Sequence, residues 1–368
     1  MEYKTIKELC DLVVDCPHST PTWTEHGKIV IRNNNIKNGR IDFTSPSFTD
    51  DEHFAQRIKR AVPKAGDIVI TREAPMGEVG MIPEGIECCL GQRMVLLRAN
   101  ERICDKYYLL YGLQSHVVQH QISWSEGTGT TVSNLRIPHL EQIRVPYVPL
   151  DQQKKISSVL YALEDKIENN RKLNDNLQQQ AQAIYTSMFI NSADPAWRQG
   201  HLSDLITVKY GKDHKKLSNG CYPVYGSGGI MRYVERPLYD KESVLIPRKG
   251  TLNNVIYVNQ PFWSVDTMFY TEMRLPNVAK YVFHFIKSKD LASMNAGSAV
   301  PSMTTDILNA IEVAIPSAQD LEKFETLVSP LYRAVQKNNI QSAKLAELRD
   351  TLLPKLMSGE LDVAHIRF

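Results

Sequence analysis

The chain has 368 residues, which is enough for two domains of ordinary size. Hydrophobic residues make up 42% and charged residues 23%, so the composition excludes a disordered chain. The formal net charge of +2 argues against a protein that binds nucleic acid with its whole surface, but it allows one basic face.

The chain shows no membrane or secretory signal. No apolar run is long enough to span a bilayer, and the first residues lack the layout of a signal peptide. We therefore expect a cytoplasmic chain with no membrane partner. The six cysteines have neither a C-x-x-C pair nor metal-ligand spacing, so we expect reduced thiols and no metal site.

Residues 1–148, called the first head, open with LCDL at 9–12. A polar stretch, RNNNIKNGRIDF at 32–43, is followed by the strand-like GDIVITREAPMGEVGMI at 66–82. The head closes with a small-residue loop and a β pattern at 127–149. These patterns predict an α+β domain that is rich in strands and contains some helix.

Residues 149–190 predict a long helix of about 38 residues, from Asp151 to Met188, which would be ~57 Å long at ~1.5 Å per residue. Spacings of four and three residues mark the a/d seam of a coiled coil. The seam residues are Ile156, Leu160, Leu163, Ile167, Asn170, Asn174, Leu177, Ala181, Ile184 and Met188.

Residues 191–316, called the second head, repeat the plan of the first. LSDL at 202–205 matches LCDL, and the polar, glycine-bearing stretch lies at 209–231. The strand pattern Ile68, Val69, Ile70 and Arg72 matches Val244, Leu245, Ile246 and Arg248, and a small-residue loop begins at 296. We expect the first head to be 25 residues longer, with the difference in its loops.

Residues 317–357 predict a second long helix, and its seam positions match those of the first helix at an offset of 168. A tail follows at 358–368. If the helices pair antiparallel and in full overlap, Asn174 faces Asn338 and Asn170 faces Ser342. This polar layer would fix the register of the spacer. The alternative is that each helix packs on its own head and the seams never meet.

Two further details of the spacer follow from single residues. Arg349 would lie opposite Leu163 and reach an acid such as Glu164. We expect Pro330 to kink or restart the second helix and Pro354 to loosen its end, because proline removes a helix hydrogen bond.

The head loops have the chemistry of a duplex DNA interface. The segment from Lys209 to Lys249 carries nine basic and four acidic residues, a net +5. Basic side chains suit phosphates, whereas arginine, asparagine and glutamine carry the paired donors and acceptors that bind base edges. The candidate DNA-binding residues are Arg32, Asn33, Asn34, Asn35, Lys37, Arg40, Arg72, Gln92, Lys212, Lys215, Lys216, Tyr225, Arg248, Asn253 and Asn254. A solvent-facing turn would explain any one of them alone.

Motifs of catalysis are missing. The sequence contains no P-loop, no dinucleotide-binding G-x-G-x-x-G, no H-E-x-x-H and no G-x-S-x-G. We therefore expect no catalytic residue and no cofactor bound by this chain.

The whole chain resembles the specificity subunits of type I restriction–modification systems. The resemblance is carried by NIKNGRIDF, GDIVITREAPMGEVG, the P-x-x-x-Q-x-x-I motif at 149–156, YPVYGSGGIM and LLPKLMSGEL. It implies two target-recognition domains that each read half of a bipartite site in double-stranded DNA, separated by an antiparallel coiled-coil spacer. It also implies two modification subunits that hold S-adenosylmethionine, and restriction subunits that act as translocases with ATP and magnesium.

Two other functions remain open at this stage. The chain could be a protein-binding coiled-coil scaffold without DNA specificity, which would show no affinity for DNA. It could also be a methyltransferase or nuclease in its own right, which the missing motifs disfavour.

Overall fold

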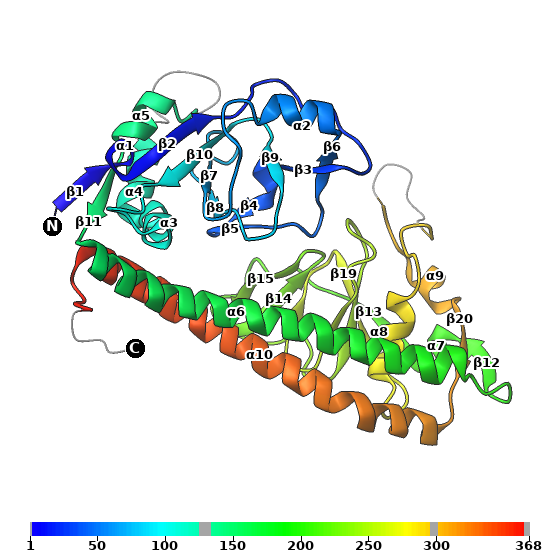
Figure 1. Ribbon diagram of the computed structural model, residues 1–368. Helices are drawn as coiled ribbons and strands as arrows, with labels where there is room; N and C mark the ends of the chain where they lie inside the picture. Colours follow the sequence, from blue (N-terminus) through cyan, green and yellow to red (C-terminus); the bar gives the residue numbers. More distant parts are fainter. Residues whose placement is uncertain (1, 125–133, 295–300, 364–368) are drawn as a thin grey trace. The chain divides into compact units, whose positions relative to one another are not determined.

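The computed structural model describes residues 2–124, 134–294 and 301–363 (Figure 1). The small-residue loops predicted at 127–133 and 296–300 therefore lie outside the described residues. The chain divides into two compact units: the first unit combines Met1–Asn169 with Gln341–Phe368, and the second unit is Asn170–Ile340. Each unit thus holds one head and a length of both long helices.

The first head is a mixed domain, as predicted. Its described strands are β1 (Glu2–Thr5), β2 (Cys10–Asp15), β3 (Lys28–Ile31), β4 (Ile36–Lys37), β5 (Arg40–Ile41), β6 (Ser47–Thr49), β7 (Ile68–Thr71), β8 (Val79–Met81), β9 (Cys88–Leu90), β10 (Met94–Ala99) and β11 (Arg144–Tyr147). Its described helices are α1 (Ile6–Leu9), the short η1 (Asn33–Asn35), α2 (Asp51–Arg57), α3 (Lys106–Gln114), α4 (His116–Ser123) and α5 (Ile137–Gln142). The strands form sheets in the orders β1-β11, β2-β10-β7-β8, β6-β3-β9 and β4-β5.

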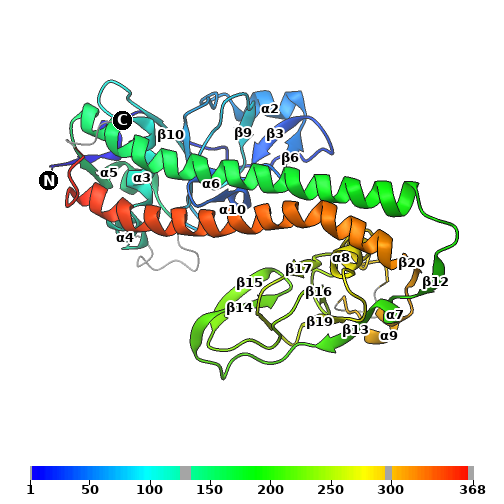
Figure 2. The same ribbon diagram turned by 90° about the horizontal axis from the view of Figure 1, so that it is seen from below.

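The second head repeats three of the four sheets of the first. Its described strands are β12 (Arg198–His201), β13 (Ile206–Tyr210), β14 (Asn219–Gly226), β15 (Gly229–Val234), β16 (Ser243–Pro247), β17 (Ile256–Val258), β18 (Trp263–Ser264), β19 (Met268–Met273) and β20 (Glu312–Ile315). Its described helices are α7 (Leu202–Leu205), α8 (Ala279–Lys287) and α9 (Thr305–Asn309). The orders are β12-β20, β13-β19-β16-β17 and β15-β14-β18, and Figure 2 shows β14 and β15 as a long hairpin.

Strand registers place the two heads in residue-by-residue correspondence. Ile70 pairs with Val95 in the first head, and Ile246 pairs with Phe269 in the second. Arg72 and Arg248 both lie two positions further on, so the predicted match of these arginines is confirmed. The third sheet repeats as well, because β3 runs parallel to β9 and β14 runs parallel to β18.

The predicted match of LCDL with LSDL is wrong. LSDL forms α7, but its counterpart in the first head is α1, which is IKEL. The backbone N–H groups of Thr5 and His201 donate to Glu8 (2.7 Å) and Asp204 (3.0 Å), so both helices begin with the same cap. LCDL instead begins at the last residue of α1 and continues into β2.

The two heads differ in length by slightly more than the sequence match predicts. The offset is 201 − 5 = 196 at the helix cap and 312 − 144 = 168 at the final strand, so the first head is 196 − 168 = 28 residues longer. Much of the addition lies between β3 and β7, where it builds the β4–β5 hairpin and α2 rather than bare loop.

Two long helices follow the heads: α6 (Leu150–Tyr185) has 36 residues and α10 (Ala318–Ser358) has 41. A π-helical turn, Thr186–Asn191, extends α6. In each unit, a length of α6 lies alongside a length of α10 in the opposite direction (Figures 1 and 2). Pro330 does not restart α10, contrary to our expectation. It lies on an exposed face, where water can satisfy the carbonyl that loses its hydrogen bond.

Seam residues of the two helices pack together in both units. In the first unit, Ile156 and Leu160 share a buried cluster with Leu352 and Leu356. In the second unit, seam residues of both helices join the core of the head itself; they are Ala181, Ile184, Phe324, Val328 and Leu331. Each fully buried Leu, Ile or Phe side chain contributes about 1.5–3 kcal/mol, so the helices are held by their own head as well as by each other.

The central polar layer is present within the second unit. The Asn338 amide donates to Asn174 Oδ1 (2.9 Å), which is the predicted pair. Asn174 Nδ2 donates in turn to Asn339 Oδ1 (2.8 Å), and Asn170 Nδ2 donates to the Asn338 carbonyl oxygen at 3.5 Å. Asn170 and Asn174 are buried, so the alternative in which the seams never meet is wrong.

Candidate nucleic-acid interface

The loop after β3 carries four of the candidate residues of the first head. Arg32 is exposed and its guanidinium lies 5.0 Å from the ring centroid of Trp23. Asn35 is buried and accepts a hydrogen bond from the Arg32 backbone N–H (2.9 Å), so this side chain shapes the loop. Asn33 donates to the Glu73 carbonyl oxygen (2.7 Å), whereas Asn34 is exposed.

The β4–β5 hairpin separates its two basic residues. Lys37 is exposed, but Arg40 faces α6. The Arg40 guanidinium donates to Glu168 Oε2 and to the Glu164 carbonyl oxygen, both at 2.7 Å. These bonds tie the hairpin to the helix and leave Lys37 as the more accessible cation of the pair.

Arg72 is held by a polar network at the end of β7. Its Nη1 donates to both carboxylate oxygens of Asp15 (2.9 and 3.0 Å), and its Nε donates to the Leu135 carbonyl oxygen (2.9 Å). Its Nη2 donates to Asn134 Oδ1 (3.1 Å). The Arg72 side chain is 11% exposed, so the whole guanidinium is committed inside the first head.

Arg93 and Gln92 lie just before β10, beside this network. Arg93 is an exposed arginine that the sequence reasoning missed. Its Nε lies 3.1 Å from Glu73 Oε2, and its side chain is 56% exposed. Gln92 donates to the His18 carbonyl oxygen. The residue type of Arg93 was visible in the sequence, but only the strand register shows that it shares a corner of the head with Arg72.

In the second head, Arg248 has a different setting from that of Arg72. Its guanidinium carbon lies 5.3 Å from the ring centroid of Tyr210, which is 52% exposed. Phe269 supports the same ring edge-on at a centroid distance of 5.1 Å. The arrangement holds a flat cation on an aromatic face near solvent.

The loop after β13 presents the lysines of the second head. Gly211 is required there, because a Cβ atom would lie 2.0 Å from the Val265 carbonyl oxygen. The backbone N–H of Lys215 donates to Asp213, which holds the pKa of that carboxyl below its usual value. Lys212, Lys215 and Lys216 are all exposed.

The other candidate DNA-binding residues of the second head form contacts inside the protein. Asn254 Nδ2 donates to the Ser227 carbonyl oxygen (2.6 Å), which ties the β14–β15 turn to the loop after β16. Asn253 donates to Asp290 and accepts from the Ala292 N–H. Tyr225 is only 8% exposed, so its ring belongs to the core.

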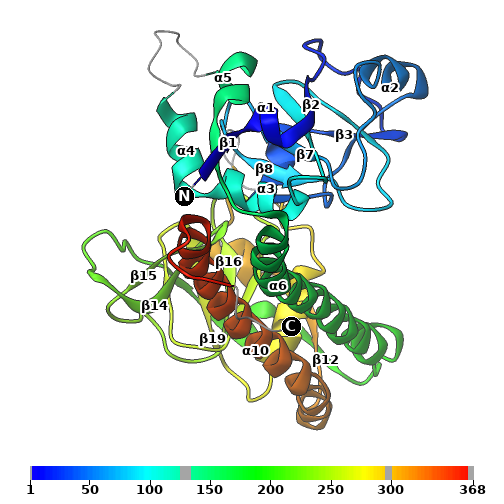
Figure 3. The ribbon, with the colours of Figure 1, turned by 60° about the vertical axis from the view of Figure 1, so that its left-hand side comes forward.

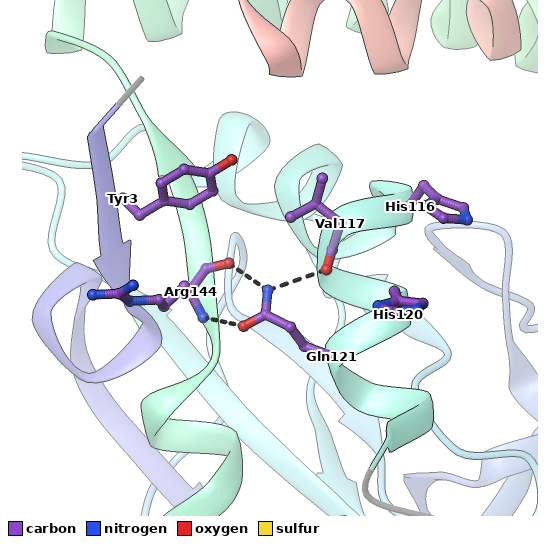
Figure 4. Close-up of a pocket in the computed structure, with 6 residues that line it drawn as sticks. All are labelled: Tyr3, His116, Val117, His120, Gln121 and Arg144. Atoms are coloured by element: carbon purple, nitrogen blue, oxygen red, sulfur yellow. Dashed lines mark hydrogen bonds between the residues drawn. The ribbon is translucent and has the colours of Figure 1, made fainter.

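An open cleft of about 380 Å³ lies on the first head (Figure 4). It is lined by Tyr3, His116, Val117, His120, Gln121 and Arg144. Figure 3 shows α4 beside β1, and the Gln121 side chain links α4 to β11 by exchanging hydrogen bonds with the Arg144 backbone (2.9 and 2.8 Å). Gln121 thereby satisfies backbone groups at the free edge of β11.

The part of the chain that the structure describes shows no group of three or more metal-binding side chains. All six cysteines are free thiols. Burial raises the pKa of Cys88 to about 12 and that of Cys89 to about 11, so these two stay protonated and unreactive. Within the same residues, no helix has the length and apolar character needed to cross a membrane.

A duplicated β-rich head with a long helix after each copy, and exposed basic side chains on loops of both heads, defines a tandem-repeat protein. The chain belongs to the family of the type I restriction modification DNA specificity domain, whose model matches residues 1–179 and 196–345. It is therefore a specificity subunit, the non-catalytic component of such a system.

Known proteins agree with this assignment. The chain is 23% identical over 350 residues to the type I restriction enzyme MjaIX specificity subunit of Methanocaldococcus jannaschii, covering 83% of this chain and 80% of that protein. A putative type I specificity subunit of Mycoplasma genitalium is 23% identical over 273 residues, covering 68% of this chain and 70% of that protein. The crystal structure of a type I S subunit from M. genitalium shares the fold, with a TM-score of 0.60 and 19% identity over 96% of this chain and 95% of that one.

Proposed function

We propose that this specificity subunit reads a bipartite site in double-stranded DNA, with one head for each half-site. The observation that supports the proposal is a repeated corner of the heads, where an arginine directly follows each of β7 and β16 and an exposed cation lies beside it, Arg93 in the first head and Lys249 in the second. Lysine and arginine side chains at such a corner would bind phosphates and so position the protein on the duplex. Side chains with paired donors and acceptors would then bind the base edges.

The two long helices would act as the spacer that sets the gap between half-sites. The Asn174–Asn338 pair supports a fixed register, because sliding by one heptad would leave buried amides without partners, at about 1–3 kcal/mol for each group. A fixed register gives a fixed gap, which we expect to correspond to about one helical turn of DNA, ~34–36 Å.

The partners follow from the family. We propose that two modification subunits dock on this chain and supply S-adenosylmethionine, and that restriction subunits add ATP- and magnesium-dependent translocation and cleavage in the cytoplasm. This chain would contribute recognition and assembly, with no cofactor of its own.

The test is to co-express the chain with its neighbouring modification subunit and to map adenine methylation across the genome by single-molecule sequencing. We expect one bipartite motif with a fixed gap. Exchanging the loops of one head should change one half of the motif and leave the other unchanged. If a properly assembled complex methylates no motif, or if both halves change together, the two-reader proposal fails and a protein-binding scaffold becomes the better interpretation.

A further inference from the structure

The matching arginines of the two heads, Arg72 and Arg248, contact different residue types. Asp15 pairs with Val95 across β2 and β10, and Tyr210 pairs with Phe269 across β13 and β19. Since Val95 and Phe269 occupy equivalent positions, Tyr210 in the second head replaces Asp15 of the first. One exchange of residue type therefore changes what surrounds the arginine.

In the first head this exchange gives a closed ion pair. Every nitrogen of the Arg72 guanidinium donates inside the head, and Nη1 donates to both oxygens of the Asp15 carboxylate at 2.9 and 3.0 Å. The two side chains are only 11% and 13% exposed. A base edge would have to break this pair before it could bind, which costs far more than one base contact returns.

In the second head, Arg248 has no carboxylate partner at the position equivalent to Asp15. Tyr210 offers a ring face and no carboxylate, and the Arg248 guanidinium lies 5.3 Å from the centroid of that ring. Among the residues that the structure describes, its side-chain hydrogen bond is a long one from Nη1 to the Asp266 carbonyl oxygen (3.3 Å). The N–H groups on the other edge of the guanidinium are therefore available to a ligand.

We propose that Arg248 reads a guanine in the half-site of the second head, with Tyr210 as its positioning residue, and that Arg72 reads no base. The inference rests on the proposed function and assigns a specificity-determining residue within it. A guanidinium held over a ring face can present two parallel N–H groups on its free edge, which match the O6 and N7 acceptors of guanine in the major groove. Exposed Lys212 and Lys249 would add attraction for the neighbouring phosphates.

The test measures binding of the full chain, in complex with the modification subunit, to duplexes that vary each base pair of the methylation motif in turn. Wild-type protein should prefer guanine at one position in one half-site. Arg248→Ala should lose about 5- to 150-fold of discrimination at that position only. Arg248→Lys keeps the charge but not the bidentate geometry, so we expect it to lose most of the same discrimination.

The positioning role of Tyr210 has its own readout. Tyr210→Phe keeps the ring and should keep the base preference. Tyr210→Asp copies the first head and should draw Arg248 into an ion pair, abolishing the preference while the thermal unfolding temperature stays close to that of the wild type. If Tyr210→Asp and Tyr210→Phe read the motif equally well, the ring does not position the arginine and the inference fails.

Arg72→Lys is the matched control in the first head. It should lower the unfolding temperature of the protein and leave the base preference at every position unchanged. The inference is overturned if Arg248→Ala weakens binding to all sequences alike, with a salt dependence reduced by about one ion, since that is the signature of a phosphate contact. A wild-type complex without any base preference would instead contradict the proposed function itself.

Discussion

Nε2 of His284 lies 2.9 Å from the hydroxyl oxygen of Tyr332, and this contact joins α8 of the second head to α10. The other ring nitrogen of His284 lies 2.8 Å from Gln182 Oε1 on α6, so one side chain ties the head to both helices of its unit. In the first unit, Tyr111 on α3 forms the corresponding link by donating to Glu164 on α6 (3.1 Å). Tyr111 and His284 lie at the same position of the equivalent helices α3 and α8, so each head contacts the long helices at the same place but with a different side chain.

His284 predicts a loss of stability in mild acid. Burial lowers the pKa of His284 to about 4 from 6.5, so the folded protein holds the neutral ring while the unfolded chain takes up a proton. Stability should therefore fall as the pH drops from about 6.5 towards 4, by an amount on the order of 3 kcal/mol over the whole range. Chemical denaturation at a series of pH values measures it.

A histidine-free variant provides the control for this pH dependence. His284→Asn should be less stable at neutral pH but should lose that part of the slope between pH 4 and 6.5. Lys287 and Asp175 line the same pocket and remain in the variant, so their charges do not distinguish the two proteins. Replacing exposed His139 by Asn should leave the slope as in the wild type. An unchanged slope in His284→Asn would contradict the assignment.

The polar layer predicts a loss of register rather than a loss of stability. Asn174→Leu combined with Asn338→Leu replaces a hydrogen-bonded amide pair by apolar contacts, which should keep or raise the free energy of unfolding. Without the polar pair, other registers and oligomers become competitive. Size-exclusion chromatography with light scattering should show more than one species. The exposed change Asn176→Leu on the same helix should give the wild-type profile, and a single wild-type species in the double variant would count against the layer as a register device.

The β4–β5 hairpin offers a pair of variants with opposite expected effects. Arg40→Met removes two bonds to α6 and should cost about 1 kcal/mol of unfolding free energy, because the side chain is partly exposed to solvent. Lys37→Met, at the paired position across the hairpin, should leave stability unchanged and weaken DNA binding. Urea unfolding and DNA titration separate the two roles. A larger loss of DNA affinity in Arg40→Met than in Lys37→Met at equal stability would reverse them.

Insertion of whole heptads at the junction of the units tests the spacer. Seven residues added to α6 between Asn169 and Asn170, with seven added to α10 between Ile340 and Gln341, leave the contacts within each unit intact. At ~1.5 Å per residue and ~3.4 Å per base pair, the gap between half-sites should grow by up to about three base pairs. The half-site sequences should not change. Methylation mapping reads both, and a motif with its original gap would refute the spacer role.

The spacer could be predicted in detail because heptad spacing is a strong, repeated signal. It identified the Asn174–Asn338 pair, and it placed Arg349 near Glu164, where the structure has an ion pair of 3.6 Å. The prediction that Pro330 kinks or restarts the second helix was wrong. The effect of a proline depends on whether the carbonyl that loses its hydrogen bond faces water, and this exposure is known only from the packed helix.

The head loops were predictable in composition but not in the direction of each side chain. Tyr225 and Asn35 look like surface groups in the sequence, yet strand pairing and local caps bury both. Arg72 and Arg248 were correctly matched, but Asp15 and Tyr210 lie far from them along the chain, so their partners became visible only with the strand registers. The similar sequences LCDL and LSDL also suggested a wrong alignment of the two heads. The cap residues Thr5 and His201 decide where each short helix begins, and they align IKEL with LSDL.

The second unit is one unbroken stretch of chain, whereas the first unit needs residues from both sides of it. During synthesis, the second unit is therefore complete once Ile340 has left the ribosome. Ile156 and Leu160 must then still wait for Leu352 and Leu356, which cover them. The unit that is begun first is finished last, so a product cut short after residue 340 would keep the second unit whole and leave Ile156 and Leu160 without their cover from α10.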